Sequence, residues 1–186
     1  MRLSMPTTPH QPAGDPGFDD PRDMLLACHE KVAHFSRLTL RLQSHLASKG
    51  ADNEAIEAAN RTLRYFRIAA PLHHDDEQRD LFPALLGLEE EALDPASIAA
   101  LHADIAQLEC EHLQLDQMWS EIDPWLDSVA RGQALAPPID LSAFVDLYHA
   151  HMQREQERVF PFTSRLSTTR RKQVCLHMAQ RRGLAI

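Results

Sequence analysis

The sequence predicts an all-α protein, an up-and-down bundle of four long helices followed by a short extra C-terminal helix. Apolar residues recur at helical spacing over four long stretches, whereas no stretch shows the alternation of apolar and polar residues that is typical of strands. The composition favours helix, with only six glycines and many Leu, Ala, Glu, Gln and Arg residues. Long helices joined by short connections are expected to pack as antiparallel neighbours.

Size, charge and cysteine content restrict the class of protein. The chain has 186 residues, enough for one domain with a full core. Its net charge of -8 argues against a general nucleic-acid binder, which needs a basic face. No apolar run approaches the roughly 18 residues of a membrane span, and the N-terminus lacks the apolar core of a signal peptide. Cys28, Cys110 and Cys175 are scattered without CxxC spacing, which favours a reducing cytoplasm over a disulfide framework.

The chain divides into three predicted parts. Residues 1–20 hold four prolines and two glycines without periodicity, which predicts a flexible N-terminal arm. Residues 21–166 are expected to form the four-helix bundle. Residues 167–186 are expected to form a basic C-terminal helix and tail, with the basic side chains on a solvated face.

The first helix is expected from Arg22 to about Ser48. Asp20 and Pro21 are the residue types that cap a helix and occupy its first position. Apolar side chains then recur one turn apart, and Gly50 marks the stop.

The second helix is expected from Asn53 to Leu86. Pro71 lies inside it and removes one backbone donor, so we expect a kink near Arg67. Pro83 is expected to distort the last turn.

The third helix is expected to begin at Asp94-Pro95 and to continue through Trp119. Pro124 either kinks this helix or starts a new segment that Asp123 caps. Residues 132–138 (GQALAPP) are a clear break.

The fourth helix is expected from Asp140 to about Phe160, and a fifth helical piece is expected from roughly Thr168 to Arg182.

Two stretches repeat one pattern. Residues 73–83 have the sequence HHDDEQRDLFP, residues 151–161 have HMQREQERVFP, and His, Glu, Gln, Phe and Pro recur at the same offsets. Each stretch carries a His-x-x-x-Glu pair, and residues i and i+4 lie on one face of a helix, about 5–6 Å apart at Cβ. A His and a Glu so placed can bind one metal, and the second carboxylate oxygen can bridge to another.

Two such helices facing each other supply His73, Glu77, His151 and Glu155. This donor set suits two metals about 3–4 Å apart. A single His-x-x-x-Glu pair is usually part of a solvated helix face, but its duplication with a shared Phe-Pro favours a metal site. His74 is an alternative to His73, although its i+4 partner is a glutamine, a poor metal ligand.

Each metal would still need donors from the other two helices. The first helix offers His29, which lies about 19 residues before the end of that helix, while His73 lies 20 residues after the start of the next. At about 1.5 Å per residue the two lie at the same height in an antiparallel pair.

The third helix offers His112 as a partner of His151. The heights of these two match if the third helix ends near Asp123. If it continues through Pro124, they match only when the following loop is asymmetric.

These residues resemble the hemerythrin-like (HHE cation-binding) family over roughly residues 22–166. The similarity is carried by ACHEKV around His29, YFRIAAPLHHDDEQRDLFPALL around His73, CEHLQLDQMW around His112 and YHAHMQREQERVFP around His151. The order His, His-x-x-x-Glu, His, His-x-x-x-Glu on four successive helices is specific.

The resemblance implies a hemerythrin-type bundle with a non-heme di-iron centre. An oxo or hydroxo group that bridges the two irons is one form of such a centre. Family members bind dioxygen, nitric oxide or iron itself, and some sense oxygen or iron or repair damaged iron centres. In the implied ligand set, one iron is held by His29 and His73, the other by His112 and His151, and both are bridged by Glu77 and Glu155.

The sequence departs from the oxygen-carrying members of that family. Those proteins have a further histidine four residues from the one on the third helix, where this chain has Leu108 and Asp116. One metal is therefore expected to lack a histidine unless Asp116 or water substitutes. This departure argues against simple oxygen carriage and leaves open positions for a small ligand.

We therefore expect a metal-binding protein for dioxygen, nitric oxide or iron, in sensing, scavenging or iron handling, more than an enzyme. The alternative is a di-iron enzyme with peroxidase- or oxidase-like activity. A ferritin-like site would need two Glu-x-x-His motifs, and the chain has one, from Glu109 to His112. Zinc or manganese in place of iron is a further alternative.

Overall fold

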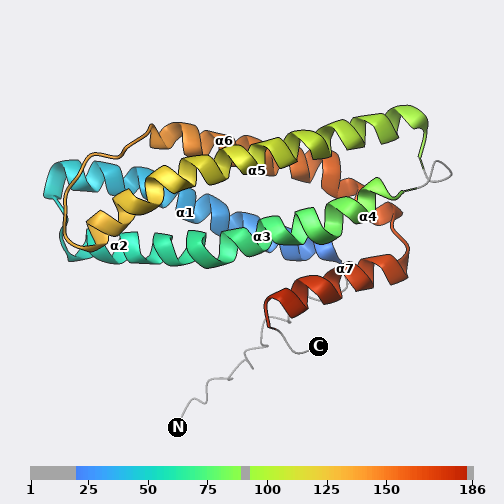
Figure 1. Cartoon of the computed structure of the whole chain (residues 1–186), viewed down its shortest axis with the longest axis horizontal. Coiled ribbons are helices and arrows are strands. Elements are labelled where there is room, and N and C mark those ends of the chain that lie inside the picture. The colour runs from blue at the N-terminus through green and yellow to red at the C-terminus, as the bar shows by residue number, and fades with distance from the viewer. Residues whose placement is uncertain (1–19, 89–92, 184–186) are drawn as a thin grey trace, which may run out of the picture.

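The computed structural model describes residues 20–88 and 93–183, and every regular element in these ranges is a helix. The predicted all-α class is therefore confirmed. The predicted N-terminal arm lies outside the described residues, apart from Asp20. Figure 1 shows long helical runs lying side by side, with a shorter C-terminal helix beside them. None of the described helices combines the length and the apolar character that a membrane crossing requires.

The first helix, α1, spans Pro21–Lys49, close to the predicted range. The Asp20 side chain accepts a hydrogen bond from the backbone N–H of Arg22, so it caps the helix as expected. At the other end, Gly50 has a φ of 75°, a conformation that glycine adopts without a steric penalty.

The second predicted helix is one helical run made of several pieces. In chain order they are α2 (Asn53–Arg64), the π-helical turn η1 (Tyr65–Ala69), α3 (Ala70–Asp76), the π-helical turn η2 (Glu77–Leu81) and α4 (Phe82–Leu86). The distortion predicted near Arg67 corresponds to η1. The one predicted in the last turn lies one turn earlier, at η2, because the last turn itself is the α-helical α4.

The third helix, α5, spans Pro95–Ala130 without a break, so Pro124 neither ends it nor starts a new segment. The loop that follows is asymmetric, because the Trp125 indole donates to the carbonyl of Leu135, 2.9 Å away, and holds the returning chain against α5. This asymmetry satisfies the condition under which His112 and His151 lie at the same height.

The remaining chain forms α6 (Leu141–Arg154), the π-helical turn η3 (Glu155–Val159), the 3-10 helix η4 (Phe160–Arg165) and α7 (Thr168–Arg181). Asp140 caps α6 and Ser167 caps α7, each through a side-chain oxygen that accepts from a backbone N–H.

Each of the three π-helical turns directly precedes a residue-proline pair. The backbone N–H of the residue after the turn donates to the carbonyl five residues earlier, and the next residue is a proline. A proline offers no N–H and disfavours α-helical geometry in the residue before it. We attribute the widened turns to these prolines, which are Pro71, Pro83 and Pro161.

The long helices pack in a ring, in which α1 and α5 each contact both α2 and α6. This arrangement supports the predicted up-and-down order of a four-helix bundle. Two clusters of buried apolar side chains fill the interior. On α1, Leu25 belongs to one cluster and Val32 to the other, and His29 lies between them. In each of the other three helical runs, the polar site residues likewise lie between residues of the two clusters. A polar layer therefore separates two apolar layers.

The basic tail does not lie wholly on a solvated face, contrary to the expectation. Arg181 donates to both Asp76 and Asp80, and Arg182 pairs with Asp76, whose side chain is fully buried. His177 adds a contact of 2.9 Å to Asp80. These pairs dock α7 on α3 and η2.

Candidate metal centre

The structure brings together all six residues that the sequence predicted as ligands. They occupy the polar layer, and each is at most 3% exposed. One comes from α1, one from α5, and two from each helical run that carries the repeated motif. The six residues are His29, His73, Glu77, His112, His151 and Glu155.

The six residues form two overlapping groups of four. One group contains His29 and His73, the other contains His112 and His151, and both contain the two glutamates. Within each group, one donor atom per residue lies within 4.8 Å of the others. Atoms bound to one ion at about 2.0–2.3 Å lie at most about 4.6 Å apart, so each group is close to the size of a metal site.

Each glutamate lies between the two histidine pairs. The Oε1 of Glu77 is 3.6 Å from His73 Nε2, and its Oε2 is 3.4 Å from His112 Nε2. The Oε2 of Glu155 is 3.0 Å from His29 Nε2, and its Oε1 is 3.0 Å from His151 Nε2. Each carboxylate therefore turns one oxygen toward each pair, which is the arrangement of a bridging ligand.

The two glutamates fit a metal better than they fit a purely structural role. All four oxygens of Glu77 and Glu155 are buried, and none has a partner at hydrogen-bond geometry within the described part of the chain. The contacts of Glu155 with His29 and His151 at 3.0 Å are ion-pair contacts of the centre itself. Leaving a buried polar group without a partner costs about 1–3 kcal/mol, and more when it is charged. Cations bound between these oxygens and the neighbouring imidazoles would offset that cost.

Two of the histidines are oriented by polar groups behind them. Glu111 lies 3.0 Å from Nδ1 of His151 and is itself held by the Gln107 amide, so Nε2 of His151 is left to face the centre. The Gln156 amide lies 2.7 Å from Nδ1 of His29. Such outer partners fix the ring orientation of metal-binding histidines.

Glu111 is a functional candidate that the sequence reasoning missed. The available signal was a charge pattern with helical spacing, since Asp104 and Glu111 lie two turns apart on α5. Arg154 and Arg158 lie one turn apart on the opposite run, and both donate to Asp104. Arg154 also lies 3.4 Å from Glu111.

The phenylalanines of the repeated motif cover histidines from other helices. Phe82 stacks on His112, with ring centroids 6.1 Å apart, and Phe160 stacks on His29 at 5.4 Å. Both are fully buried. They therefore do more than fill the core, because they shield the centre on the side of the apolar cluster that contains Leu25.

Burial and close charges set the protonation of these side chains. Burial, together with the charge of Glu155, raises the pKa of Glu77 well above its usual range. Burial opposes the ionisation of Glu155, but the adjacent His151 holds its pKa well below the usual range. Burial would likewise lower the pKa of His151, but Glu155 and Glu111 raise it to about 9. Burial and the charge of His151 lower the pKa of His112 to about 4.

The structure separates the two adjacent histidines of the second run. His73 lies in the group with His29, whereas His74 lies beside His112 and His151. Asp116, the predicted substitute for a missing histidine, is exposed and belongs to neither group of four.

Comparison with known proteins agrees with this geometry. A family model described as the hemerythrin HHE cation binding domain matches residues 20–163 of the chain. An uncharacterized protein of Haemophilus influenzae is 30% identical over 142 residues, which cover 75% of this chain and 76% of that protein.

Proposed function

Because the chain belongs to the hemerythrin HHE cation-binding family, we propose that its polar layer holds two iron ions as a non-heme di-iron centre. His29 and His73 bind one ion, His112 and His151 bind the other, and the two glutamates bridge them. The observation that carries this proposal is the pair of buried carboxylates, each with one oxygen toward each histidine pair and no other partner in the described residues.

The donor set supports iron that binds a small ligand. Four neutral imidazoles and two carboxylates suit divalent iron with positions left for dioxygen or nitric oxide. A groove of about 640 Å³ reaches the centre between α1 and the run of α6 and η3. His29, Met152 and Gln156 line it, so the groove touches the candidate centre at His29 and offers a route for a small molecule.

We propose that the bound iron senses or scavenges such a molecule, or that the protein stores or delivers the iron itself. The scattered cysteines support the reducing cytoplasm as the compartment. The chain's own residues bind and orient the ions, and the two phenylalanines limit the access of water.

Metal analysis after anaerobic loading with ferrous iron tests this function. Two irons per chain and a near-ultraviolet absorption band that appears on exposure to oxygen are expected. Glu77→Ala should reduce the iron content to near the metal-free level, because it removes a donor from both ions. His102→Ala, which changes an exposed histidine on α5, is the matched control. A colourless zinc protein, or unchanged iron loading in Glu77→Ala, would contradict the proposal, and rapid turnover of peroxide would favour the enzymatic alternative.

A further inference from the structure

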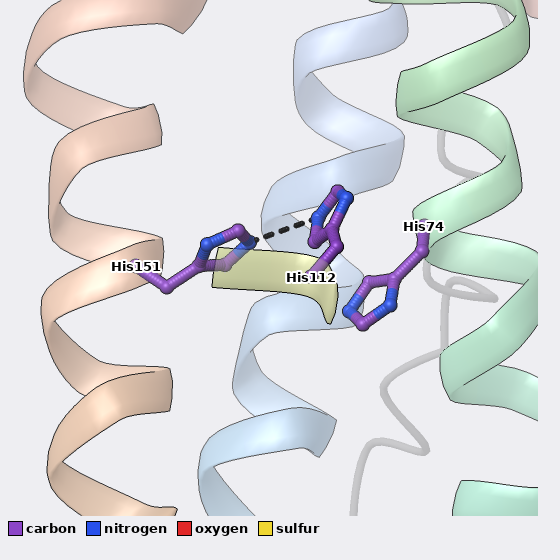
Figure 2. Close-up of side chains that lie close together, drawn as sticks. All are labelled: His74, His112 and His151. Carbon is purple, nitrogen blue, oxygen red and sulfur yellow. Dashed lines mark hydrogen bonds between the residues drawn. The ribbon is translucent and has the colours of Figure 1, made fainter. Parts of the chain in front are cut away.

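A seventh polar side chain borders the centre. His74 is 7% exposed, and its ring lies over that of His112, with centroids 4.1 Å apart and planes inclined by 19°. Figure 2 shows the two rings with His151 next to them. One ring nitrogen from each of these three histidines lies within 4.8 Å of the others.

Helix geometry explains why His73 and His74 serve different sides of the centre. Successive residues of an α-helix point about 100° apart. The ring of His73 contacts that of His29 edge-on, with centroids 5.1 Å apart, while the ring of His74 stacks on His112. The short helix α3 therefore reaches both ion positions.

Simple packing does not account for His74. Its Nε2 is buried and has no hydrogen-bond partner among the described residues. An apolar side chain of similar size would fill the same space without leaving a buried polar atom unpaired. One ring nitrogen of His74 lies within 4.8 Å of a ring nitrogen of His112 and of His151, so the imidazole borders the candidate position of that ion.

We propose that His74 is a third histidine ligand of the ion bound by His112 and His151. This inference rests on the proposed di-iron function. Its Nε2, which has no hydrogen-bond partner among the described residues, is the atom available to that ion. His74 then supplies, from the second helix, the histidine that Leu108 and Asp116 do not supply from the third.

The proposal makes the two ion positions unequal. The position between His112 and His151 gains a third imidazole, while the position between His29 and His73 keeps two. The position between His29 and His73 is therefore the more open one, and it lies on the side of the groove that His29 lines. A small ligand that enters through the groove meets the more open ion first.

His74→Phe tests the proposal, because it keeps an aromatic ring over His112 and removes both nitrogens. Ferrous iron is titrated anaerobically against a competing chelator. The wild-type chain should bind two ions, and the variant should bind one with unchanged affinity and the other at least about tenfold more weakly, since even outer-shell changes at metal sites cost about 10–100-fold. His102→Ala should bind both ions like the wild type.

A second variant separates ligation from folding. In His74→Ala, added imidazole should restore the affinity for the ion bound by His112 and His151, because free imidazole can occupy the vacated space. Two ions bound at wild-type affinity by His74→Phe would overturn the role of His74 and leave the di-iron centre intact. Equal weakening of both ions, or no rescue by imidazole, would also overturn it. A wild-type chain that binds no iron would instead overturn the proposed function.

Discussion

The docking of α7 gives a prediction about stability. In the variant Arg181→Ala/Arg182→Ala, the carboxylate of Asp76, which is fully buried in the wild-type chain, loses both of its arginine partners. Removing one side of a buried ion pair costs about 3–5 kcal/mol, because the remaining charge has neither water nor a counter-charge. The free energy of unfolding should therefore fall by about 3–5 kcal/mol.

The assay is thermal and urea unfolding at one fixed concentration of metal, since bound metal adds to the apparent stability. For a domain of this size each kcal/mol shifts the Tm by about 2–4 °C, so we expect a drop of about 6–20 °C. Arg170→Ala is the matched control, because Arg170 is exposed on the same helix and, among the described residues, its side chain bonds only Gln173. It should change stability by no more than about 0.5 kcal/mol.

The contribution of the buried charge can be isolated. Adding Asp76→Asn to the double arginine variant removes the unpaired charge and should restore a large part of the lost stability. If the double variant unfolds like Arg170→Ala, or if Asp76→Asn restores nothing, the ion pairs do not dock α7 and the reasoning is refuted.

Three further predictions concern the centre. Ferrous iron binding near pH 7 should release at least one proton, because a ligand imidazole must be neutral and nearby carboxylates, against the effect of burial, raise the pKa of His151 to about 9. Glu77, whose pKa is also raised, can add to this release. The affinity should then rise at least about tenfold per pH unit between pH 6 and 8, and calorimetric heats that do not depend on the buffer would contradict this. Glu111→Gln should weaken iron binding by about 10–100-fold in a chelator competition, because the change removes the carboxylate that orients His151. Glu109→Gln, at an exposed position, is the control, and equal iron affinities of the two variants would show that Glu111 plays no such part. Phe160→Leu should lower the free energy of unfolding by about 1 kcal/mol in urea titrations, because the ring stacked on His29 is lost, and a variant as stable as the wild type would argue against that stack.

The sequence predicts those parts of the molecule that local chemistry determines. Caps such as Asp20 and Asp140 act on backbone groups two or three residues away, so the starts of the helices follow from the sequence. The six residues of the centre could be identified because two of them repeat with helical spacing in each motif. The remaining two, His29 and His112, followed from the need for donors on the other helices.

Contacts between distant segments were not predictable in the same way. Where α5 continues through Pro124, the Arg67 guanidinium of the second run bonds Asp123 at 2.6 and 2.8 Å and Asp127 at 3.3 Å. These bonds hold the residues on both sides of the proline against the second run. Similarly, Arg181 meets Asp76 across 105 residues of chain. Neither partner carries a local signal that identifies the other.

The structure gives a physical reason for each position of the repeated motif. The His and Glu of each copy face the centre, and the Phe covers a histidine from another helix. The Pro comes one residue later, and in both copies the π-helical turn before it begins at the glutamate. In the second copy the Gln also contacts His29. Side chains outside the motif, His74 and Glu111, make the centre unequal, because each acts on only one side of it. In the proposed di-iron centre, the duplicated motif would provide the bridging carboxylates, and His74 would make one ion position less open than the other.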